Sequence, residues 1–578
     1  MRRTKIVCTL GPATESKSVL QELVQAGMDV ARFNFSHGTH ESQAKMLESL
    51  RAVPGGSQVA TLLDTKGPEI RIGYFKDGKV ELKESAEFTL TTRDVKGSAS
   101  IVSVTFADLP KDVAEGARIL LADGLIELKV LHKTDTDITC RVVNGGELSD
   151  QKGVNLPGSC LSMPFVSDKD KADIEFAAQA GFDFIAASFT RTADDILAIR
   201  AILEKCHGRQ IRIIAKIENS QGVADIDDII RVSDGIMIAR GDLGVEVPLE
   251  ELPMIQKTLI KKVYHAGKVA ITATQMLESM INHPRPTRAE ATDVANAIYD
   301  GTSAIMLSGE TAAGQYPVES VRTMARIAQR TESDIDYRRR FKAIDLAIIP
   351  DVTNAISHAA CTTAYEVGAA AVIAVTHSGS TARMISKFRP SMPILGCSPV
   401  DVVLRQMKMS WGVIPVHVDH AENSDELFEL AVTSAQKKGL ITNGDVVVIT
   451  GGVPLGMSGT TNMLKVHLVG NVLLKGTGVN ALEAVAPLCI AQTEEEAKAK
   501  FKDGDILVMP YTTNELLHIM KRASGIVTEE AGSDSHAAIV GMALDIPVVV
   551  GAYNASHVLK SGMIVRLDAK NGMICNTD

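Results

Sequence analysis

The chain has 578 residues, 22% of them charged, with a formal net charge of −10 at pH 7. This length predicts several domains, and the moderate, dispersed negative charge excludes a typical nucleic-acid-binding protein. No apolar run approaches membrane-spanning length, and Met1-Arg-Arg leads into a strand rather than a long apolar leader. The eight cysteines are scattered without CxxC pairs, which indicates a cytoplasmic protein with reduced thiols.

Eight short apolar runs in the first two thirds of the chain each end in polar residues. Parallel strands buried on both faces are almost continuously apolar, and amphipathic stretches of helical length separate most of these runs. The pattern predicts a (β/α)8 barrel, an α/β fold with its chemistry at the carboxyl ends of the strands. The predicted strands are Lys5–Thr9, Val30–Phe33, Val59–Leu63, Phe184–Ala187, Ile211–Ala215, Gly235–Ala239, Val269–Ala273 and Ala304–Leu307.

The barrel is interrupted between its third and fourth strands. Residues 68–163 carry short alternating runs and Asp-Gly turns, which are hairpin signals. We expect an inserted β-barrel lid over the active site, the alternative being an insertion without function. The catalytic barrel then comprises 1–67 and 164–339. Helices alternate with strands again over 340–474, as in a small α/β regulatory domain, and a further segment covers 475–578.

A segment near the end of the barrel is especially informative. Residues 275–311 begin with a helix-like stretch that carries Met276 and Met280. A second helix follows and ends at Asp300-Gly301, and a short strand then leads into Ser308, Glu310 and Thr311. An apolar strand that turns abruptly polar is typical of the catalytic face of a barrel.

Charged residues at the strand ends indicate phosphoryl transfer. Glu218 and Asp242 follow the neighbouring fifth and sixth strands, and such a pair suits a hard divalent cation that keeps several waters. Lys216 and Arg71 are suited to neutralise a transferring phosphoryl group. Each residue alone is better explained as a surface ion pair, but together at one barrel face they favour catalysis.

A phosphate cradle is predicted in the regulatory domain, where polar residues follow an apolar strand and open a helix. Hydroxyl and backbone N–H groups at a helix N-terminus attract phosphate. Residues 451–462 are expected to fold over this site, and the alternative is a plain helix cap. The predicted effector residues are Thr376, His377, Ser378, Gly379, Ser380 and Thr381.

Long motifs along about residues 1–474 resemble the pyruvate kinase family. They are NFSHGTHE (34–41), LDTKGPEIR (63–71), KGVNLPG (152–158), IAKIENSQGV (214–223), ARGDLGVE (239–246) and the run from Met276 to Ala312. The resemblance implies phosphoryl transfer from phosphoenolpyruvate to ADP, giving pyruvate and ATP in glycolysis. It also implies an allosterically regulated homotetramer.

The resemblance assigns roles at the strand ends. Glu218 and Asp242 would hold Mg²⁺ (or Mn²⁺), and Thr274 would help to deliver a proton to the enolate. The implied catalytic residues are Lys216, Thr274, Arg71, Ser308 and Glu310. The implied substrate ligands are Arg32, Lys216, Gly241, Asp242 and Thr274, and the implied nucleotide ligands are Arg32, Asn34, His37, Arg71 and Lys152.

A monovalent cation is expected beside the divalent one. The ends of the second and third strands offer an amide, two hydroxyls and one carboxylate, which suit a large monovalent ion better than Mg²⁺. In the resembled family this ion is K⁺, and members that dispense with it tend to carry lysine where this chain has Glu69. The expected K⁺ ligands are Asn34, Ser36, Asp64 and Thr65.

The family places a sugar phosphate effector at 376–381. The stretch near Asp419 and Glu422 is acidic, which favours a monophosphate such as ribose 5-phosphate, or AMP, over fructose 1,6-bisphosphate.

The C-terminal segment resembles a different family. Residues 525–551 resemble the swivelling phosphohistidine domain of phosphoenolpyruvate-utilising enzymes, so the rival function is a phosphotransferase acting through His536. Ala531, Asp534 and Met542 depart from the motif of active domains, and Met542 stands where those domains have arginine. We therefore expect a docked domain that does not carry phosphate.

Overall fold

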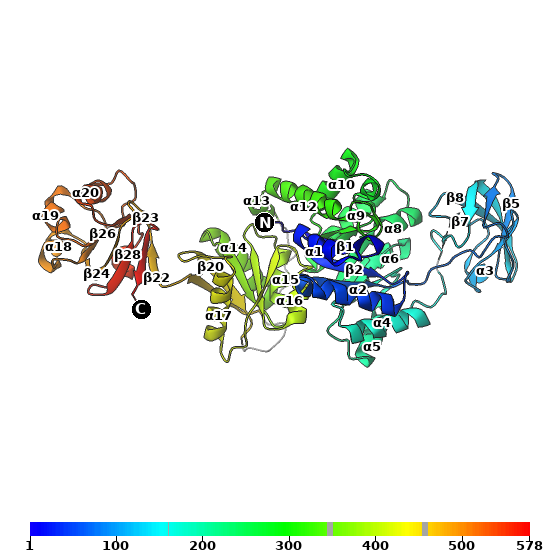
Figure 1. Cartoon of the computed structure of the whole chain (residues 1–578), viewed down its shortest axis with the longest axis horizontal. Helices are drawn as coiled ribbons and strands as arrows, with labels where there is room; N and C mark the ends of the chain where they lie inside the picture. Colours follow the sequence, from blue (N-terminus) through cyan, green and yellow to red (C-terminus); the bar gives the residue numbers. More distant parts are fainter. Residues whose placement is uncertain (160, 344–350, 454–460, 578) are drawn as a thin grey trace. The chain divides into compact units, whose positions relative to one another are not determined.

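The computed structural model divides into two compact units, which are described separately. The described residues are 1–159, 161–343, 351–453 and 461–577. The first unit holds most of residues 1–358 and 376–417, and the second most of 359–375, 418–453 and 462–577. Figure 1 labels many of the elements, which are numbered in chain order. None of the helices in these ranges is long and apolar enough to cross a membrane.

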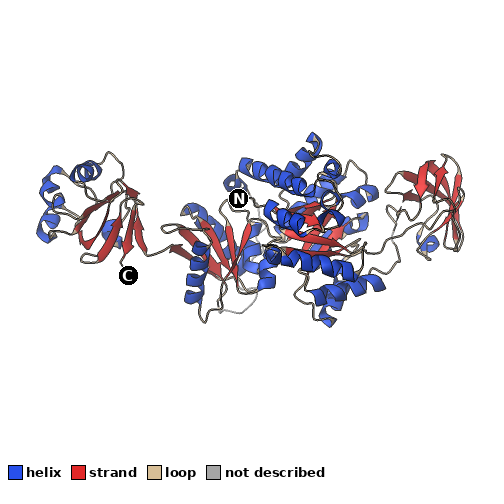
Figure 2. Cartoon of the chain, viewed as in Figure 1, coloured by secondary structure: helices blue, strands red, loops and turns tan. Residues whose placement is uncertain are grey.

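A closed parallel barrel forms the centre of the first unit, in the order β1-β16-β15-β14-β13-β12-β3-β2. Figure 2 shows its strands enclosed by helices. The predicted barrel is therefore confirmed, and five of its predicted strands have the observed bounds. The eight strands are β1 (Lys5–Thr9), β2 (Val30–Asn34), β3 (Ala60–Asp64), β12 (Phe184–Ala187), β13 (Arg212–Ile217), β14 (Gly235–Ala239), β15 (Val269–Ala273) and β16 (Ala304–Leu307).

The other strands differ from their predicted bounds by one or two residues. The strand β13 continues to Ile217, so Lys216 lies inside the strand rather than after it. Residues 276–281 contain only the short 3-10 helix Glu278–Ile281 where a helix-like stretch was expected. The helix α10 (Arg288–Asp300) ends as predicted, because Gly301 adopts a left-handed conformation with φ +98° and caps it.

Alternate strand positions divide the barrel core in two. One cluster faces the outer helices, which include α1 (Lys17–Ala26), α9 (Leu252–His265) and α12 (Pro317–Asp334). The other fills the barrel interior with residues such as Val7 and Met237, together with Met409. Met409 comes from the segment between α16 (Asp401–Met407) and β19 (Val413–His417), and its side chain is fully buried.

The inserted segment is a β domain, as predicted. Its six-stranded sheet has the order β11-β7-β8-β9-β5-β6, and a two-stranded sheet pairs β10 with β4. Ala122, Asp123 and Gly124 all have positive φ between β7 and β8, which makes a tight hairpin turn. The strands are β4 (Lys79–Leu82), β5 (Glu87–Thr91), β6 (Ile101–Ser103), β7 (Arg118–Leu121), β8 (Ile126–Lys133), β9 (Asp137–Asn144), β10 (Gly146–Ser149) and β11 (Val154–Asn155).

The remaining sheets follow the barrel. In the first unit β18 (Ile394–Ser398) pairs in parallel with β19. In the second unit β17 (Ala371–Val375) pairs in parallel with β20 (Val446–Gly451), which pairs antiparallel with β21 (Met463–Leu468). The C-terminal part has its own eight-stranded sheet, in the order β22-β29-β28-β24-β25-β26-β27-β23. Its strands are β22 (Val472–Lys475), β23 (Thr477–Gly478), β24 (Glu483–Ile490), β25 (Ile506–Met509), β26 (Gly525–Thr528), β27 (Val548–Val550), β28 (Ile564–Asp568) and β29 (Met573–Asn576). The predicted domain boundaries stay a prediction.

Candidate active site

A buried lysine lies at the centre of the barrel mouth. The Nζ atom of Lys216 donates to the Ser188 hydroxyl at 2.7 Å and to Asp64 Oδ1 at 3.0 Å. It also lies 3.0 Å from Glu218 Oε1. These partners come from the ends of β3, β12 and β13, so barrel closure itself gathers them. The side chain of Lys216 is only 10% exposed.

The charges around Lys216 fix its ionisation. Burial lowers the pKa of Lys216, but the Asp64 and Glu218 carboxylates outweigh burial and raise it to about 12. Burial raises the pKa of Asp64, but the Arg32 and Lys216 cations reverse this and hold it below its usual value. Lys216 therefore presents a full positive charge at neutral pH.

Arg32 comes from the middle of β2 and shares the Asp64 carboxylate with this lysine. Its Nε atom donates to Asp64 Oδ2 at 2.6 Å, and its Nη1 atom donates to the Thr9 hydroxyl at 3.0 Å. One buried carboxylate thus orients two cations at the mouth, as a site for a phosphate-bearing substrate requires.

Glu218 and Asp242 supply the carboxylates predicted to bind a divalent cation. Glu218 is almost fully buried, and its Oε2 atom accepts from the Phe189 N–H at 2.6 Å. Burial, with the nearby charge of Asp242, raises the pKa of Glu218 to about 7 against the opposing effect of Lys216. A carboxyl group in that state ionises readily when a cation arrives, so the donor set fits a hard divalent ion.

Within the described ranges, no three or more His, Cys, Asp or Glu side chains gather closely enough to hold a metal ion. A site with two carboxylates would complete its shell with water and substrate oxygens.

Thr274 follows β15 in a strained conformation. Its φ is +67° and that of Gln275 is +54°, which is uncommon for residues other than glycine. The Thr274 hydroxyl accepts from the Gly241 N–H at 2.8 Å and donates to the Ala273 carbonyl at 2.6 Å. The structure therefore joins Thr274 to the start of α8 (Arg240–Glu246), which carries Asp242.

Ser308 and Glu310 follow β16, and the Glu310 carboxylate binds two backbone N–H groups. The fully buried Glu310 accepts from the Ser308 N–H at 2.7 Å and from the Leu277 N–H at 3.0 Å. Burial raises the pKa of Glu310. These contacts give Glu310 a positioning role, since it fixes the loop that follows Thr274 and Gln275.

In the lid, the predicted site residue Arg71 binds other lid residues rather than the side chains around Lys216. Arg71 Nη2 lies 2.5 Å from Glu69 Oε1, and Arg71 Nη1 donates to the Gln151 carbonyl at 2.7 Å. Lys152 is exposed beside Gln151. The guanidinium of Arg71 is therefore shared between Glu69 and Gln151.

The residues predicted to bind a monovalent ion lie at the ends of β2 and β3 and on the segments that follow. Asn34 and Asp64 are direct partners in the register of β2 and β3. The Asn34 Oδ1 atom accepts from the Ser36 N–H at 3.0 Å, and the Thr65 hydroxyl donates to the Ala186 carbonyl at 3.2 Å. Ser36 and His37 are exposed on the loop that follows β2.

The predicted effector cradle opens α15 (Ser380–Lys387), with Gly379 as its left-handed N-cap. The Ser378 carbonyl accepts from Arg212 at 2.9 Å and from Arg383 at 3.2 Å. The hydroxyls of Thr381 and Thr461 are 2.8 Å apart. Thr376 is buried, whereas His377 is exposed. Residues 454–460 of the covering loop lie outside the described residues.

Three residues of the mouth were missed by the sequence analysis. Ser188 links Lys216 to Asp64, and Phe189 adopts φ +55° to present its N–H to Glu218. Arg240 is buried and donates to the carbonyls of Ala273 and Thr274 at 3.3 and 2.7 Å. The only signal for them was their place directly after predicted strands.

An open cavity lies between the lid and the barrel mouth, lined by Glu69, Asn155, Phe189, Arg191, Asn219 and Asp242 among others. In the C-terminal sheet domain, both ring nitrogens of His536 have partners. Nδ1 lies 2.9 Å from the Thr512 hydroxyl, and Nε2 lies 3.0 Å from Asn514 Oδ1.

Family models match most of the chain. The barrel domain of pyruvate kinase matches residues 1–321, its alpha/beta domain matches 354–467, and the mobile domain of PEP-utilising enzymes matches 501–572.

Whole-chain relatives agree with these matches. Pyruvate kinase from Geobacillus stearothermophilus is 48% identical over 577 residues, covering 99% of this chain and 98% of the relative. That from Sporosarcina psychrophila is 47% identical and covers 100% and 99%. The crystal structure of a pyruvate kinase from Cryptosporidium parvum superimposes with a TM-score of 0.77 at 40% identity, covering 81% of this chain and 96% of that one. Fold and site thus define a (β/α)8-barrel kinase. The chain belongs to the pyruvate kinase family.

Proposed function

We propose that this chain transfers the phosphoryl group of phosphoenolpyruvate to ADP, forming pyruvate and ATP, as a cytoplasmic homotetramer. The observation that carries the proposal is the buried, charged Lys216 at the carboxyl end of β13, held by Asp64, Ser188 and Glu218. Phosphoryl transfer depends mainly on positioning and charge stabilisation, which this group provides.

The residues at the barrel mouth have separate roles in this reaction. Lys216 and Arg32 offset the negative charge on the transferring phosphoryl group, and Arg71 joins them from the lid. Glu218 and Asp242 would hold Mg²⁺ or Mn²⁺, and the ion would supply further positive charge next to the substrate oxygens. The N–H groups at the start of α8 receive the substrate carboxylate.

A proton must then reach the enolate left by phosphoryl loss. The Thr274 hydroxyl now donates to the Ala273 carbonyl and accepts from Gly241. Rotation of this hydroxyl, with a water behind it, delivers the proton to the methylene carbon of the enolate, giving the methyl group of pyruvate. Arg240 positions Thr274 by binding its carbonyl.

Replacing Lys216 tests the proposal directly. We expect Lys216→Met to lower kcat by about 10²–10³, the scale for losing one preorganised charge stabiliser, and to change KM for phosphoenolpyruvate much less. Steady-state assay of ADP-dependent pyruvate formation measures both. The matched control is Lys5→Met, since Lys5 is another buried barrel lysine, bound to the Val413 carbonyl at the opposite end of the barrel. Near-normal turnover in Lys216→Met would contradict the proposal.

We propose K⁺ as the monovalent ion, held by Asn34, Ser36, Asp64 and Thr65. Two observations support this proposal. Asn34 pairs with Asp64 across β2 and β3, and the four side chains offer one carboxylate together with neutral oxygens, a set that suits a large monovalent cation.

Activity is expected to be low when Na⁺ replaces K⁺ at equal ionic strength. Glu69→Lys should partly restore it, because an ammonium group then substitutes for the ion. Initial rates in the two salts measure the effect. The control is Glu147→Lys, which changes an exposed glutamate of the lid that pairs with Lys79. Full activity of the unmodified chain without K⁺ would exclude this ion site.

We propose that residues 376–381 bind a phosphorylated effector, a sugar monophosphate or AMP. Arg212 and Arg383 add positive charge next to Ser378. Arg212 also begins β13, the strand that carries Lys216, so the cradle and the catalytic lysine share one rigid element.

Ser378→Asp should abolish activation while basal turnover stays unchanged, because a fixed carboxylate repels the effector phosphate. Rate curves against phosphoenolpyruvate, with and without ribose 5-phosphate or AMP, measure activation. Ser333→Asp, on the exposed face of α12, is the control. If Ser378→Asp responds to these effectors as the unmodified chain does, the site lies elsewhere.

The C-terminal domain is proposed not to carry phosphate, because Thr512 and Asn514 occupy both ring nitrogens of His536. His536→Ala should leave phosphoenolpyruvate-dependent ATP formation within about twofold of normal, as expected for a residue outside the transition state. Incubation with labelled phosphoenolpyruvate should give no acid-labile label on His536. Such a label, or a large loss of turnover, would favour the rival phosphohistidine function.

A further inference from the structure

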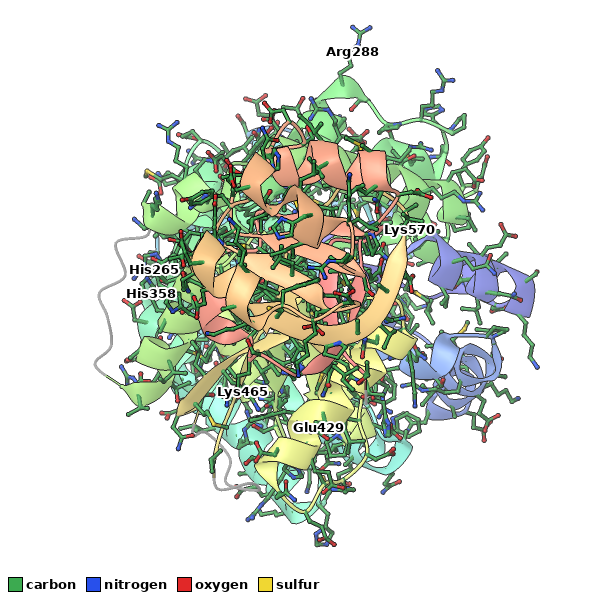
Figure 3. The ribbon with its side chains drawn as sticks, turned by 90° about the vertical axis from the view of Figure 1, so that its left-hand side faces the viewer. His265, Arg288, His358, Glu429, Lys465 and Lys570 are labelled. Carbon is green, nitrogen blue, oxygen red and sulfur yellow. The ribbon has the colours of Figure 1, made fainter. Side chains whose placement is uncertain are left out.

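The short helix α8 is held at both of its ends, and the barrel holds its beginning. The Gly241 N–H donates to the Thr274 hydroxyl at 2.8 Å. Arg240 donates to the Thr274 carbonyl at 2.7 Å and forms an ion pair with Asp293 at 2.7 Å. Asp293 lies on α10, whose first residue, Arg288, is exposed and points outward in Figure 3. These contacts tie the beginning of α8 to the barrel.

The other end of α8 is bound by the inserted lid. The Nδ2 atom of Asn155 donates at 3.1 Å to the Oε1 atom of Glu246, the last residue of the helix. The Leu156 N–H also donates to the Glu246 carboxylate. The tight turn between β7 and β8 approaches the preceding residue of α8, since a Cβ atom on Gly124 would lie 3.5 Å from Val245 Cγ1. Two separate parts of the lid therefore contact the last turn of α8.

The Glu246 carboxylate depends on these lid donors. Burial raises the pKa of Glu246, and the hydrogen bonds from Asn155 and Leu156 act against burial. Removing the donors of a buried carboxylate costs free energy, because its desolvation is then no longer offset. Glu246 therefore favours the lid positions in which both donors stay in place.

The segment that carries Asn155 is itself part of the lid sheet. Asn155 pairs with Leu120 in the register of β11 and β7, and the Gly153 carbonyl accepts from the Ala122 N–H at 3.3 Å. Hydrogen bonding fixes the distance between neighbouring strands of a sheet. A movement of the lid sheet must therefore also move the donors of Glu246.

The helix α8 links Glu246 to the carboxylate expected to bind the divalent cation. Asp242 and Glu246 are four residues apart, so they lie on the same face of the helix, and both line the open cavity between the lid and the barrel mouth. The helix is about 10 Å long, and its backbone hydrogen bonds make it stiff over that length. A displacement of Glu246 by the lid is therefore expected to shift the Asp242 carboxylate as well.

We propose that Glu246 is a positioning residue through which the lid adjusts the divalent cation site. The lid holds Glu246 through Asn155 and Leu156, and α8 carries the position of Glu246 to the Asp242 carboxylate. This inference rests on the proposed function, in which Glu218 and Asp242 bind the cation. It adds that the affinity for the cation depends on the hydrogen bond between Asn155 and Glu246.

Exchanging the amide and the carboxylate tests the proposal. Asn155→Asp should weaken Mn²⁺ binding about tenfold, because it removes the donor and brings two carboxylates together, although its added negative charge alone would attract the cation. Adding Glu246→Gln to this variant should restore the affinity to within about twofold, since the amide then donates in the opposite direction and the net charge is unchanged. Titration of the full chain with Mn²⁺ alone, at constant K⁺ concentration, measures the affinity through the electron paramagnetic resonance signal of free Mn²⁺.

The matched control is Glu127→Gln, which changes an acid to an amide on the lid surface, where Glu127 pairs with Arg118. It should bind Mn²⁺ as the unmodified chain does. Unchanged Mn²⁺ affinity in Asn155→Asp would overturn the proposal, and so would a double variant that binds Mn²⁺ no more tightly than Asn155→Asp. ADP-dependent pyruvate formation by the unmodified chain is measured in parallel, and its absence would instead contradict the proposed function.

Discussion

The catalytic end of this molecule depends on one buried cation. Two of the three partners of Lys216 come from other strands, Asp64 from β3 and Ser188 from the end of β12. Without those strands in place, a buried ammonium group would lose most of its compensation. Closure of the barrel in register is therefore a condition for the site. Conversely, a change of register by one residue would turn Lys216 away from Asp64, since strand side chains alternate in direction.

The sequence predicted the barrel well because its signal is local. A buried parallel strand is a short apolar run, and the bounds of β1, β12, β14, β15 and β16 follow directly from such runs. The presence of Lys216, Glu218 and Asp242 at neighbouring strand ends was likewise readable from spacing. The end of β13 was misplaced because Lys216 is polar yet lies within the strand, where tertiary partners outweigh its low preference for such a position.

The remaining features of the site depend on contacts distant in sequence. Phe189 and Thr274 adopt left-handed conformations that the local sequence does not predict. A hydrogen bond to Glu218 holds Phe189, and a hydrogen bond from Gly241 holds Thr274. Arg240 supports Thr274 only because β14 and β15 are neighbours in the barrel. The state of Arg71, bound to Glu69, also required the structure, since a sequence motif does not show which partner a side chain holds.

The position of Met409 in the barrel interior has a consequence for synthesis of the chain on the ribosome. The last barrel strand ends at Leu307, but the interior cluster is completed by a methionine about a hundred residues later, which takes roughly 5–20 s to translate. During that interval the nascent barrel has all its strands and an unfilled end. The part of the apolar barrel interior that Met409 covers is then left open, so completion of the barrel core waits for translation of a segment that lies outside the barrel.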